Sequence, residues 1–441
     1  MPPWVEVAYR KVTGGNQSSA SNGISEDAAK VVAPNFFIQV LASVATKTGD
    51  QLLSPRLVLT WLLASIHAPA AAVSLLVPVR EAFALLPQVL VGAQVQRSAI
   101  RKWYWVGGSI CQGLCVFGIV WVATQTSSPD MAGWACLALL GLFSGARVFN
   151  SISGKDLMGK TLPKRQRGIA GGTASAVAGG STLVVALYFM TLEQAKTDPA
   201  DIARILQLAG SFWFVGAVLF RRLREFPSPE VDTDQAIWQQ AFAGFDQLRS
   251  NRDFRNFVAA RTGLIGNALV LPLIVLDVFK SSEGRGFVLG ALMAASGLAA
   301  LCSGFIWGKL ADRSSRRVLV SVGLGGAGIA LAAILVRTLS PAGPLQTVLL
   351  GIAFFLFAII HQGTRIARKT YLIDLAHADD RATLVAVSNT VIGINLLLVG
   401  ACIGYLTQID PRWAIAGCAA FSLMGGLLAM LLPEVEAIPD T

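Results

Sequence analysis

The stretch GFIWGKLADRSSRRVLVSVG, residues 304–323, places a dense group of charges between two apolar runs. Five charged residues fall within nine positions: Lys309, Asp312, Arg313, Arg316 and Arg317. No charged residue occurs at 286–308 or at 318–336. Uncharged apolar runs of about 18 residues or more are typical of transmembrane helices, because about 20 helical residues cross the hydrocarbon layer. The stretch therefore indicates a charged turn between two membrane spans.

The composition extends this interpretation to the whole chain. Its 441 residues are 54% hydrophobic and 14% charged, whereas soluble domains carry roughly 25% charged residues. The charge-poor runs that qualify as spans are 35–64, 69–92, 103–125, 131–154, 168–191, 203–221, 255–279, 286–308, 318–337, 345–370, 382–407 and 412–432. The sequence predicts an all-α membrane protein with twelve transmembrane helices and no sizeable soluble domain.

The distribution of basic residues predicts the orientation. Lys and Arg collect in cytoplasmic loops. With a cytoplasmic N-terminus, the inside loops hold 21 basic residues, Arg368 and Lys369 among them, and the outside loops hold six. Both termini are therefore predicted to be cytoplasmic, in a multi-pass protein of the plasma or bacterial inner membrane. The same distribution explains the net charge of +10 without nucleic acid as a partner.

Three landmarks recur in the same order at nearly equal offsets. They are Gly49-Asp50-x4-Pro55 with Gly266-Asn267-x4-Pro272 at 217, the loop from Gly92 with the loop from Gly308 at 216, and Gly145-x-Arg147-x8-Asp156 with Gly363-x-Arg365-x8-Asp374 at 218. This pattern indicates two copies of a six-helix unit. The expected segments are a cytoplasmic tail at 1–34, bundles at 35–221 and 255–432, a linker at 222–254 and a tail at 433–441.

The linker is predicted to contain an amphipathic helix that only joins the two halves. Its apolar residues recur at helical spacing: Ile237, Trp238, Ala241, Phe242, Phe245 and Leu248. Such a face suits a helix lying on the membrane surface, and Thr233 or Asp234 is the candidate cap at its start.

Charged residues inside the spans follow a second regularity. Apart from Arg80 and Glu81 in the second span, they fall in spans one, four, seven and ten: Lys47, Asp50, Arg56, Arg147, Arg261 and Arg365. Charges at membrane depth are costly and normally face a bundle interior or an aqueous cavity. A period of three helices within a six-helix unit is the pattern of nested repeats whose first helices line a central cavity.

The stretch GKLADRSSRR at 308–317 resembles the signature loop Gly-x-x-x-Asp-Arg-x-x-Arg-Arg of the major facilitator superfamily of secondary transporters. The first copy, GAQVQRSAIRK at 92–102, has Gln96 at the aspartate position and one extra residue. Arg147 in LFSGARVFNS resembles the family's helix-four arginine motif, whereas the fifth span lacks the Gly-Pro pair of the antiporter motif. The resemblance covers the whole transmembrane chain. It implies two six-helix bundles related by a pseudo-two-fold axis, which move a solute by alternating access.

Three residues are candidates for proton coupling: Asp50, Glu81 and His361. Lys47 lies three residues before Asp50 on one helical face. The pair is either a structural ion pair or a coupling carboxylate with its tuning cation. Candidates for the substrate cavity are Lys47, Arg56, Arg80, Arg147, Arg261, Asn267 and Arg365. Arginine binds carboxylate or phosphate in a fork geometry, so the set favours an anionic or zwitterionic solute. Alternatively, Arg56, Arg147, Arg261 and Arg365 extend to the membrane interfaces.

The charged loops on the cytoplasmic side predict an inner gate. Its candidate residues are Gly92, Arg97, Arg101, Asp156, Gly308, Asp312, Arg313, Arg316, Arg317 and Asp374. Asp156 and Asp374 end spans four and ten beside the basic loops, so ion pairs to these loops would hold the gate closed. The alternative is that the charges only set the topology. Because the signature carboxylate is intact only in the second copy, Asp312 is expected to matter more than Gln96.

The sequence therefore predicts a secondary transporter that moves a small organic solute by alternating access with proton coupling. The alternatives are an uncoupled facilitator, an exporter of amphipathic compounds, or a non-transporting membrane receptor on the same fold. No phosphate-binding Gly-x4-Gly-Lys-Ser/Thr motif and no cluster with metal-ligand spacing occurs, so neither an enzyme nor a cofactor is expected. The expected partners are the solute, protons and the lipid bilayer, with a monomeric chain.

Overall fold

The computed structural model describes residues 3–13, 24–191, 197–227, 245–376 and 381–435, and these residues form helices and no strands. The helices are α1 (Pro3–Thr13), α2 (Glu26–Ala29), α3 (Val32–Leu52), α4 (Val58–Ser65), α5 (Ala70–Leu85), α6 (Gln88–Gln96), α7 (Lys102–Gln125), α8 (Pro129–Thr161), α9 (Lys164–Thr191), α10 (Pro199–Phe220), α12 (Arg252–Gly263), α13 (Gly266–Ser281), α14 (Gly286–Leu339), α15 (Pro344–Leu375), α16 (Arg381–Ile409) and α17 (Pro411–Ala429). The predicted all-α fold class is confirmed.

Ten helical segments of the described chain are long and apolar enough to cross a membrane. One of them, α14, has 54 residues, and non-helical backbone at Ser314 (φ −167°, ψ 99°) divides it into the expected eighth and ninth spans. The expected first span is not one continuous helix, because the chain breaks between α3 and α4 around Pro55. Neither piece is among the ten segments, so the count of twelve spans stays a prediction.

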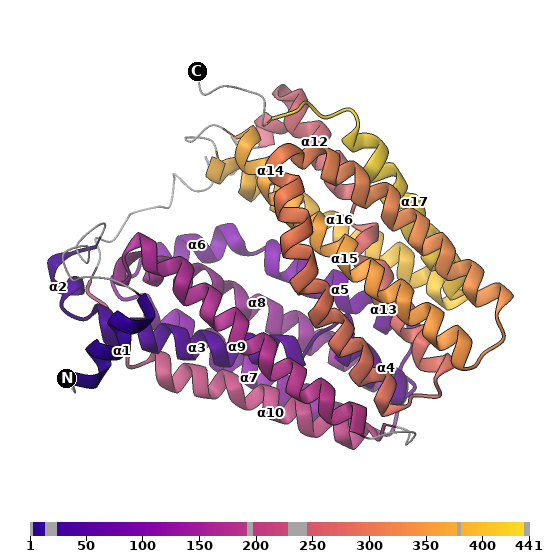
Figure 1. Cartoon of the computed structure of the whole chain (residues 1–441), viewed down its shortest axis with the longest axis horizontal. Helices are drawn as coiled ribbons and strands as arrows, with labels where there is room; N and C mark the ends of the chain where they lie inside the picture. Colours follow the sequence, from indigo (N-terminus) through magenta and orange to yellow (C-terminus); the bar gives the residue numbers. More distant parts are fainter. Residues whose placement is uncertain (1–2, 14–23, 192–196, 228–244, 377–380, 436–441) are drawn as a thin grey trace.

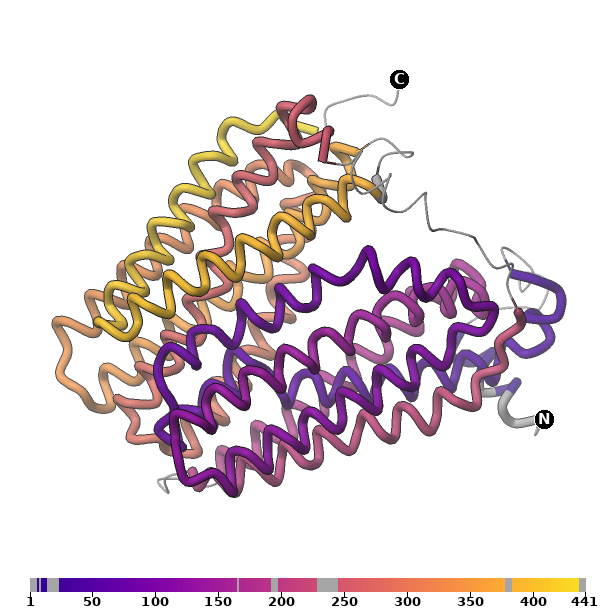
Figure 2. Tube along the Cα trace, turned by 180° about the vertical axis from the view of Figure 1, so that it is seen from behind, coloured from indigo at the N-terminus to yellow at the C-terminus, as the bar shows by residue number. Residues whose placement is uncertain are grey.

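The helices form two bundles that touch at one end and diverge toward the other. Helices α3–α10 form the N bundle and α12–α17 form the C bundle (Figure 1), and the view from behind shows the same divergence (Figure 2). At the closed end, the Thr197 amide donates to the Gly284 carbonyl at 2.9 Å. There the rings of Trp61 and Phe279 also meet edge to face, with centroids 5.0 Å apart. Helix α1 and the C-terminal end of α17 lie at the open end.

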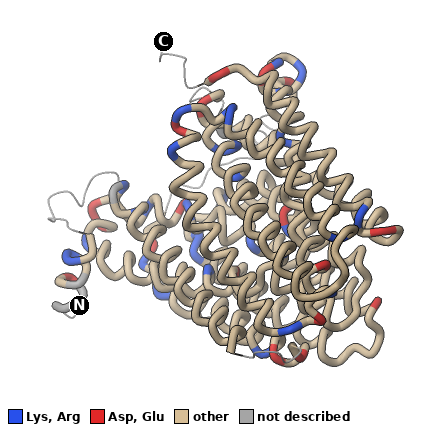
Figure 3. Tube along the Cα trace, turned by 45° about the vertical axis from the view of Figure 1, so that its right-hand side comes forward, with Lys and Arg blue, Asp and Glu red and all other residues tan. Residues whose placement is uncertain are grey.

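Basic residues are concentrated at the open end, near both chain termini (Figure 3). This is the distribution that the count of loop charges predicts for the cytoplasmic side. The open end is therefore the expected cytoplasmic end, which would make this conformation an inward-facing one.

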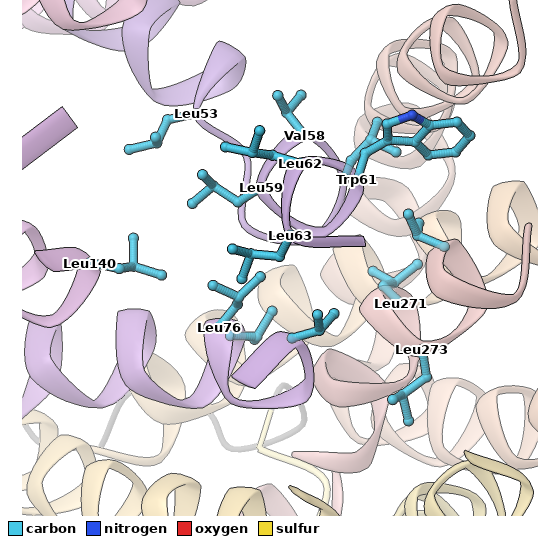
Figure 4. Close-up of a cluster of buried hydrophobic side chains, with 14 of the residues drawn as sticks. Leu53, Val58, Leu59, Trp61, Leu62, Leu63, Leu76, Leu140, Leu271 and Leu273 are labelled. Atoms are coloured by element: carbon cyan, nitrogen blue, oxygen red, sulfur yellow. The ribbon is translucent and has the colours of Figure 1, made fainter. Parts of the chain in front are cut away.

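The hydrophobic core is shared at the closed end and divided at the open end. The largest cluster combines Trp61 and Leu63 of α4 with Leu271 and Leu273 of α13 (Figure 4). Toward the open end, one cluster around Trp105 and Phe220 belongs to the N bundle alone. A second cluster around Phe257 and Tyr371 belongs to the C bundle alone. The open ends of the bundles therefore hold together independently of each other.

Interruptions in the helices place polar groups at membrane depth. Residues 53–57 separate α3 from α4, and a second break at Leu264 and Ile265, which is not at the equivalent position of the repeat, separates α12 from α13. Proline contributes to the first break, since Pro55 has no amide hydrogen to continue a helix. Irregular backbone at this depth is tolerated where it is buried in protein or lines a cavity. The first break puts Arg56 at the wall of the cavity described below.

Two expectations at the chain's polar segments have different outcomes. The tail predicted at 1–34 is not simply a tail, because α1 packs on α3 through Tyr9 and Phe36, whose rings lie 5.6 Å apart, and α3 starts at Val32. Most of the predicted linker helix lies outside the described residues: Thr233, Asp234, Ile237, Trp238, Ala241 and Phe242. Phe245 and Leu248 belong to a short helical segment at 245–250.

Substituting Gly263 with alanine is expected to destabilise the C bundle. A Cβ at Gly263 would collide with the backbone of Gly425 in α17, and overpacking of this kind costs about 1–3 kcal/mol. Thermal unfolding of the purified protein in detergent measures the effect. The matched control is Gly304→Ala in α14, where nothing lies within 4 Å of the added Cβ. Equal melting temperatures for the two variants would contradict the close helix contact.

Candidate functional site

A cavity lies between the two bundles and is lined by both. The space within it is about 550 Å³, part of which is continuous with solvent. The lining residues are Arg56, Glu81, Leu85, Arg261, Leu264, Ile265, Ala268, His361, Thr364, Arg365, Arg368, Ile392 and Leu396. They come from the α3–α4 break and α5 in the N bundle, and from α12, α13, α15, α16 and the α12–α13 break in the C bundle.

One face of α15 supplies the largest polar part of the wall. His361, Thr364, Arg365 and Arg368 are spaced by three and four residues, so they share one side of the helix. The charge count predicts Arg368 to lie in a cytoplasmic loop, but α15 continues to Leu375. Arg368 therefore belongs to the cavity wall, and its spacing from His361 is the signal that identifies it.

The N bundle contributes an ion pair to the same cavity. Arg56, in the break between α3 and α4, contacts Glu81 of α5 at 3.2 Å. The adjacent Arg80 points elsewhere, as the angle of about 100° between neighbouring helical residues requires. Of the described residues that line the cavity, Glu81 alone is acidic.

Arg261 connects the wall of the cavity to the contact between the bundles. Its side chain is 7% exposed, and it donates to the Ser388 hydroxyl at 2.6 Å and to the Asn389 amide oxygen at 3.0 Å. The Asn389 amide nitrogen in turn donates to the Gln88 side chain of the N bundle at 3.2 Å. Arg261 is thus held by neutral groups, and its charge has no ion-pair partner within the described ranges.

The charges of the cavity do not balance. Four guanidinium groups, from Arg56, Arg261, Arg365 and Arg368, face the single carboxylate of Glu81. Neither Arg365 nor Arg368 makes an ion pair or a side-chain hydrogen bond with any residue that the structure describes. A charge removed from water without a partner is costly. An anion bound between these groups would compensate their charge.

Asp50 belongs to a separate cluster within the N bundle. Its carboxylate bonds to Arg147 of α8 and lies 3.2 Å from Arg80 of α5. The expected pair with Lys47 is replaced by these contacts, since the Lys47 ammonium donates to the Ser175 hydroxyl at 2.8 Å. None of these residues is among those that line the cavity.

Asn267, the counterpart of Asp50 in the repeat, is not at the cavity surface either. Its side chain is fully buried. It donates to the Val322 carbonyl at 3.0 Å and to the Thr364 hydroxyl at 3.2 Å. A Cβ on Gly326 would collide with the Asn267 side-chain oxygen, so the two residues fit closely. Asn267 ties α13 to α14 and α15, and its side chain takes no part in the cavity wall.

At the open end of the N bundle, the first signature loop is held by two acidic residues. Arg101 contacts Asp156 of α8 at 2.6 Å, and Lys160 contacts the same carboxylate at 3.1 Å. Glu225, which follows α10, accepts hydrogen bonds from the backbone amides of Arg101 and Lys102, each at 2.8 Å. No role is predicted for Glu225 from the sequence, although it is the first acidic residue after the last span of its half.

Glu434 occupies the corresponding place in the C bundle. It follows α17, accepts a hydrogen bond from the Ser314 hydroxyl at 2.6 Å and lies 3.6 Å from Arg316 and 3.5 Å from Arg317. The same Ser314 hydroxyl accepts from the Arg317 amide at 3.1 Å, which caps the second part of α14. In each half, an acidic residue that follows the last helix thus contacts the basic residues of the signature loop.

The remaining gate candidates lie on the surface of the open end. Arg97, Asp312, Arg313 and Asp374 have exposed side chains. Of the two glycines, a Cβ at Gly92 would meet only Ile152, at 3.9 Å, and one at Gly308 would meet nothing within 4 Å. The ion-pair networks around Glu225 and Glu434 each stay within one bundle, so in this conformation they do not close a gate between the halves.

The sequence also gives no signal for a buried ion pair near the closed end. Asp277 of α13 is 6% exposed and contacts Arg337 of α14 at 2.8 Å. Both residues belong to the C bundle, and the pair lies outside the cavity wall. Within the described ranges, no group of three or more His, Cys, Asp or Glu residues is placed to hold a metal ion.

Solved structures with the same fold are membrane transporters. The chain aligns with a mutant of the nucleoside transporter NupG at a TM-score of 0.66 and 12% identity, over 90% of this chain and 99% of that one. A D-xylose–proton symporter aligns at a TM-score of 0.63 and 14% identity, over 91% of this chain and 98% of that one. A bacterial homologue of the iron transporter ferroportin in an inward-facing state aligns at a TM-score of 0.65 and 12% identity, over 92% of this chain and 99% of that one.

Sequence comparison assigns the family. No curated protein sequence matches the chain. The Major Facilitator Superfamily, however, matches over residues 40–359 and again over residues 257–440. The second match starts near the beginning of the C bundle. The chain, a multi-pass membrane protein, belongs to the major facilitator superfamily of transporters.

Proposed function

We propose that this transporter carries a small organic anion across the plasma or bacterial inner membrane by alternating access of its two bundles. The observation that carries the proposal is the charge of the shared cavity, where four guanidinium groups face one carboxylate. Arginine pairs with carboxylate and phosphate groups through two parallel hydrogen bonds. A neutral or cationic solute would leave these groups unpaired when water is excluded.

The packing of the bundles supports alternating access. At the open end each bundle has its own hydrophobic cluster and its own acidic latch, Glu225 or Glu434. The open ends can therefore approach or separate as rigid units. The closed end has a shared cluster, which would have to part in the opposite state. Close contacts between α16 and α5, such as Gly400 against Pro78, join apolar surfaces, whereas the hydrogen bonds from Thr197 to the Gly284 carbonyl would have to break.

We propose Glu81 as the group that couples anion movement to protons. In the empty cavity its carboxylate is neutralised by Arg56 at 3.2 Å. A bound anion would compete for Arg56, and a proton would then neutralise the released carboxylate. Asp50 is the less direct candidate, because its two arginine partners keep it within the N bundle. His361 lines the cavity and is assigned a role in recognition below.

Counterflow in proteoliposomes tests the proposal. Vesicles containing the purified protein and loaded with unlabelled anion should take up the same labelled anion faster than empty vesicles do. Mono- and dicarboxylates, phosphate monoesters, neutral sugars and lipophilic cations form the panel. Exchange of cations or sugars alone would refute the anion carrier. Anion binding without any counterflow would instead indicate a receptor.

Glu81→Gln is expected to uncouple anion movement from protons. Wild-type protein should acidify the lumen of vesicles during anion uptake, as read by an enclosed pH-sensitive dye, whereas the variant should retain anion counterflow without acidification. Glutamine keeps the size of the side chain but cannot exchange a proton. Acidification by the variant at the wild-type ratio to anion uptake would exclude Glu81 as the coupling group and leave Asp50.

A further inference from the structure

His361 is buried at the cavity wall without a well-formed hydrogen bond. Its side chain is 6% exposed, and neither ring nitrogen meets hydrogen-bond geometry with any described residue. The backbone of Asn267 interacts with the imidazole, but it can pair with one nitrogen at most. Thr364, on the same helical face, is satisfied by contrast, because it accepts from Asn267 and donates to the Ile360 carbonyl at 3.2 Å. Buried polar groups are nearly always hydrogen-bonded. The unpaired imidazole therefore indicates that a bound ligand supplies the missing hydrogen-bond partner.

The charges around His361 set a lower limit on the charge of that ligand. Within the described wall, Glu81 neutralises Arg56, while Arg261, Arg365 and Arg368 keep no carboxylate partner. A monoanion would compensate one of these three charges, and a dianion would compensate two. Because unpaired charges are costly when the cavity excludes water, the wall favours at least two negative charges.

The imidazole adds a requirement of a different kind. In its neutral form, histidine offers one donor and one acceptor nitrogen. Carboxylate and phosphate oxygens accept hydrogen bonds only, so an anionic group leaves the acceptor nitrogen unpaired. A hydroxyl group both donates and accepts, and it satisfies either nitrogen. His361 and Arg365 are one helical turn apart, about 6 Å along the axis at 1.5 Å per residue. The hydroxyl and the anionic group therefore fit on one small molecule.

We propose that the cavity selects a hydroxylated organic dianion, with an anionic group at Arg365 and Arg368 and a hydroxyl at His361. This inference rests on the proposed anion transport and names the class of its substrate. Hydroxylated dicarboxylates and phosphate monoesters of polyols share this chemistry. Arg261 and Arg56, which also line the cavity, are placed to balance the remaining charge.

Paired probes test the inference on the purified full-length protein. Titration calorimetry compares malate with succinate and 2-hydroxypropyl phosphate with propyl phosphate, two pairs that each differ by one hydroxyl group, and compares each hydroxylated dianion with the monoanion lactate. In at least one pair, the hydroxylated dianion should bind about tenfold more tightly than its deoxy partner, the contribution of one hydrogen bond to a buried group. It should also bind about tenfold or more tightly than lactate, which leaves one more arginine charge uncompensated. The pair that shows the preference tells dicarboxylates from phosphate esters.

Variants of His361 locate the preference. His361→Leu should lower the affinity for the hydroxylated probe to that for its deoxy partner, and His361→Gln, which keeps a donor and an acceptor, should restore part of the difference. A hydroxyl preference that persists in His361→Leu overturns the inference. So does wild-type protein that binds lactate as tightly as the dianions. If no anion binds or exchanges at all, it is the proposed anion transport that fails.

Discussion

Substituting Arg365 with glutamine is expected to lower anion counterflow about 100-fold. Arg365 lines the cavity, and no described residue forms an ion pair with it, so its charge is available to the substrate. Removing one partner of a desolvated charge pair costs about 2–5 kcal/mol, and about 100-fold corresponds to roughly 2.7 kcal/mol. Initial rates of counterflow in proteoliposomes, normalised to incorporated protein, give the comparison.

A neighbouring residue provides the control. Lys369→Gln removes the same charge from the same helix, but Lys369 does not line the cavity, so its counterflow should stay within about twofold of wild type. Arg365→Lys should fall between wild type and glutamine, because lysine keeps the charge but loses the planar fork. Equal losses for Arg365→Gln and Lys369→Gln would show that surface potential, and not the cavity, attracts the anion.

Glu225→Gln is expected to destabilise the N bundle by about 3 kcal/mol. The Glu225 side chain is fully buried, and its two oxygens accept from the backbone amides of Arg101 and Lys102 and from the Lys160 ammonium. A glutamine replaces one acceptor oxygen with a donor, which faces another donor and leaves it unsatisfied. An unsatisfied buried group costs about 1–3 kcal/mol, and more when a charge is involved. Thermal unfolding in detergent measures the loss.

Glu434→Gln is the matched change in the second copy. The Glu434 side chain is 30% exposed, so water can take over part of its hydrogen bonding and the loss of stability should be less than half as large. Similar melting temperatures for the two variants would mean that the burial of the carboxylate does not determine how much stability it contributes. A larger loss of stability for Glu434→Gln than for Glu225→Gln would contradict the prediction that the buried Glu225 contributes more.

The main features of the fold follow from the sequence, and the breaks within helices do not. Long apolar runs define spans because the hydrocarbon layer imposes their length. The pair Asp50 and Asn267 identifies equivalent positions of the two copies, because the other landmark pairs are separated by nearly the same number of residues. The break at residues 53–57 gives no signal in hydropathy, since apolar residues on both sides make it part of one run. Pro55 is the main local indication, and a proline alone also occurs in the continuous helix α13, at Pro272.

The site is predictable to the extent that charge at membrane depth identifies it. Glu81, Arg261, His361 and Arg365 are charged or titratable groups inside apolar runs, and the cavity contains all of them. Which charges pair with each other depends on helix rotation and on packing between distant segments, which spacing along the chain does not encode. This is why Asp50 bonds to Arg147, 97 residues away, and not to Lys47.

If the two bundles alternate as proposed, the surplus of positive charge in the cavity would also make the empty transporter sensitive to membrane voltage. Moving one charge through the full membrane potential changes its free energy by roughly 2.3 kcal/mol per 100 mV. In an alternating-access cycle, the cavity exchanges contact with one solution for contact with the other, so its three uncompensated arginines experience that field without moving far. A potential that is negative inside would then favour the inward-facing empty state, which is the orientation that the open end suggests. A bound dianion would cancel two of the three charges, so the loaded carrier would respond to voltage much less than the empty one.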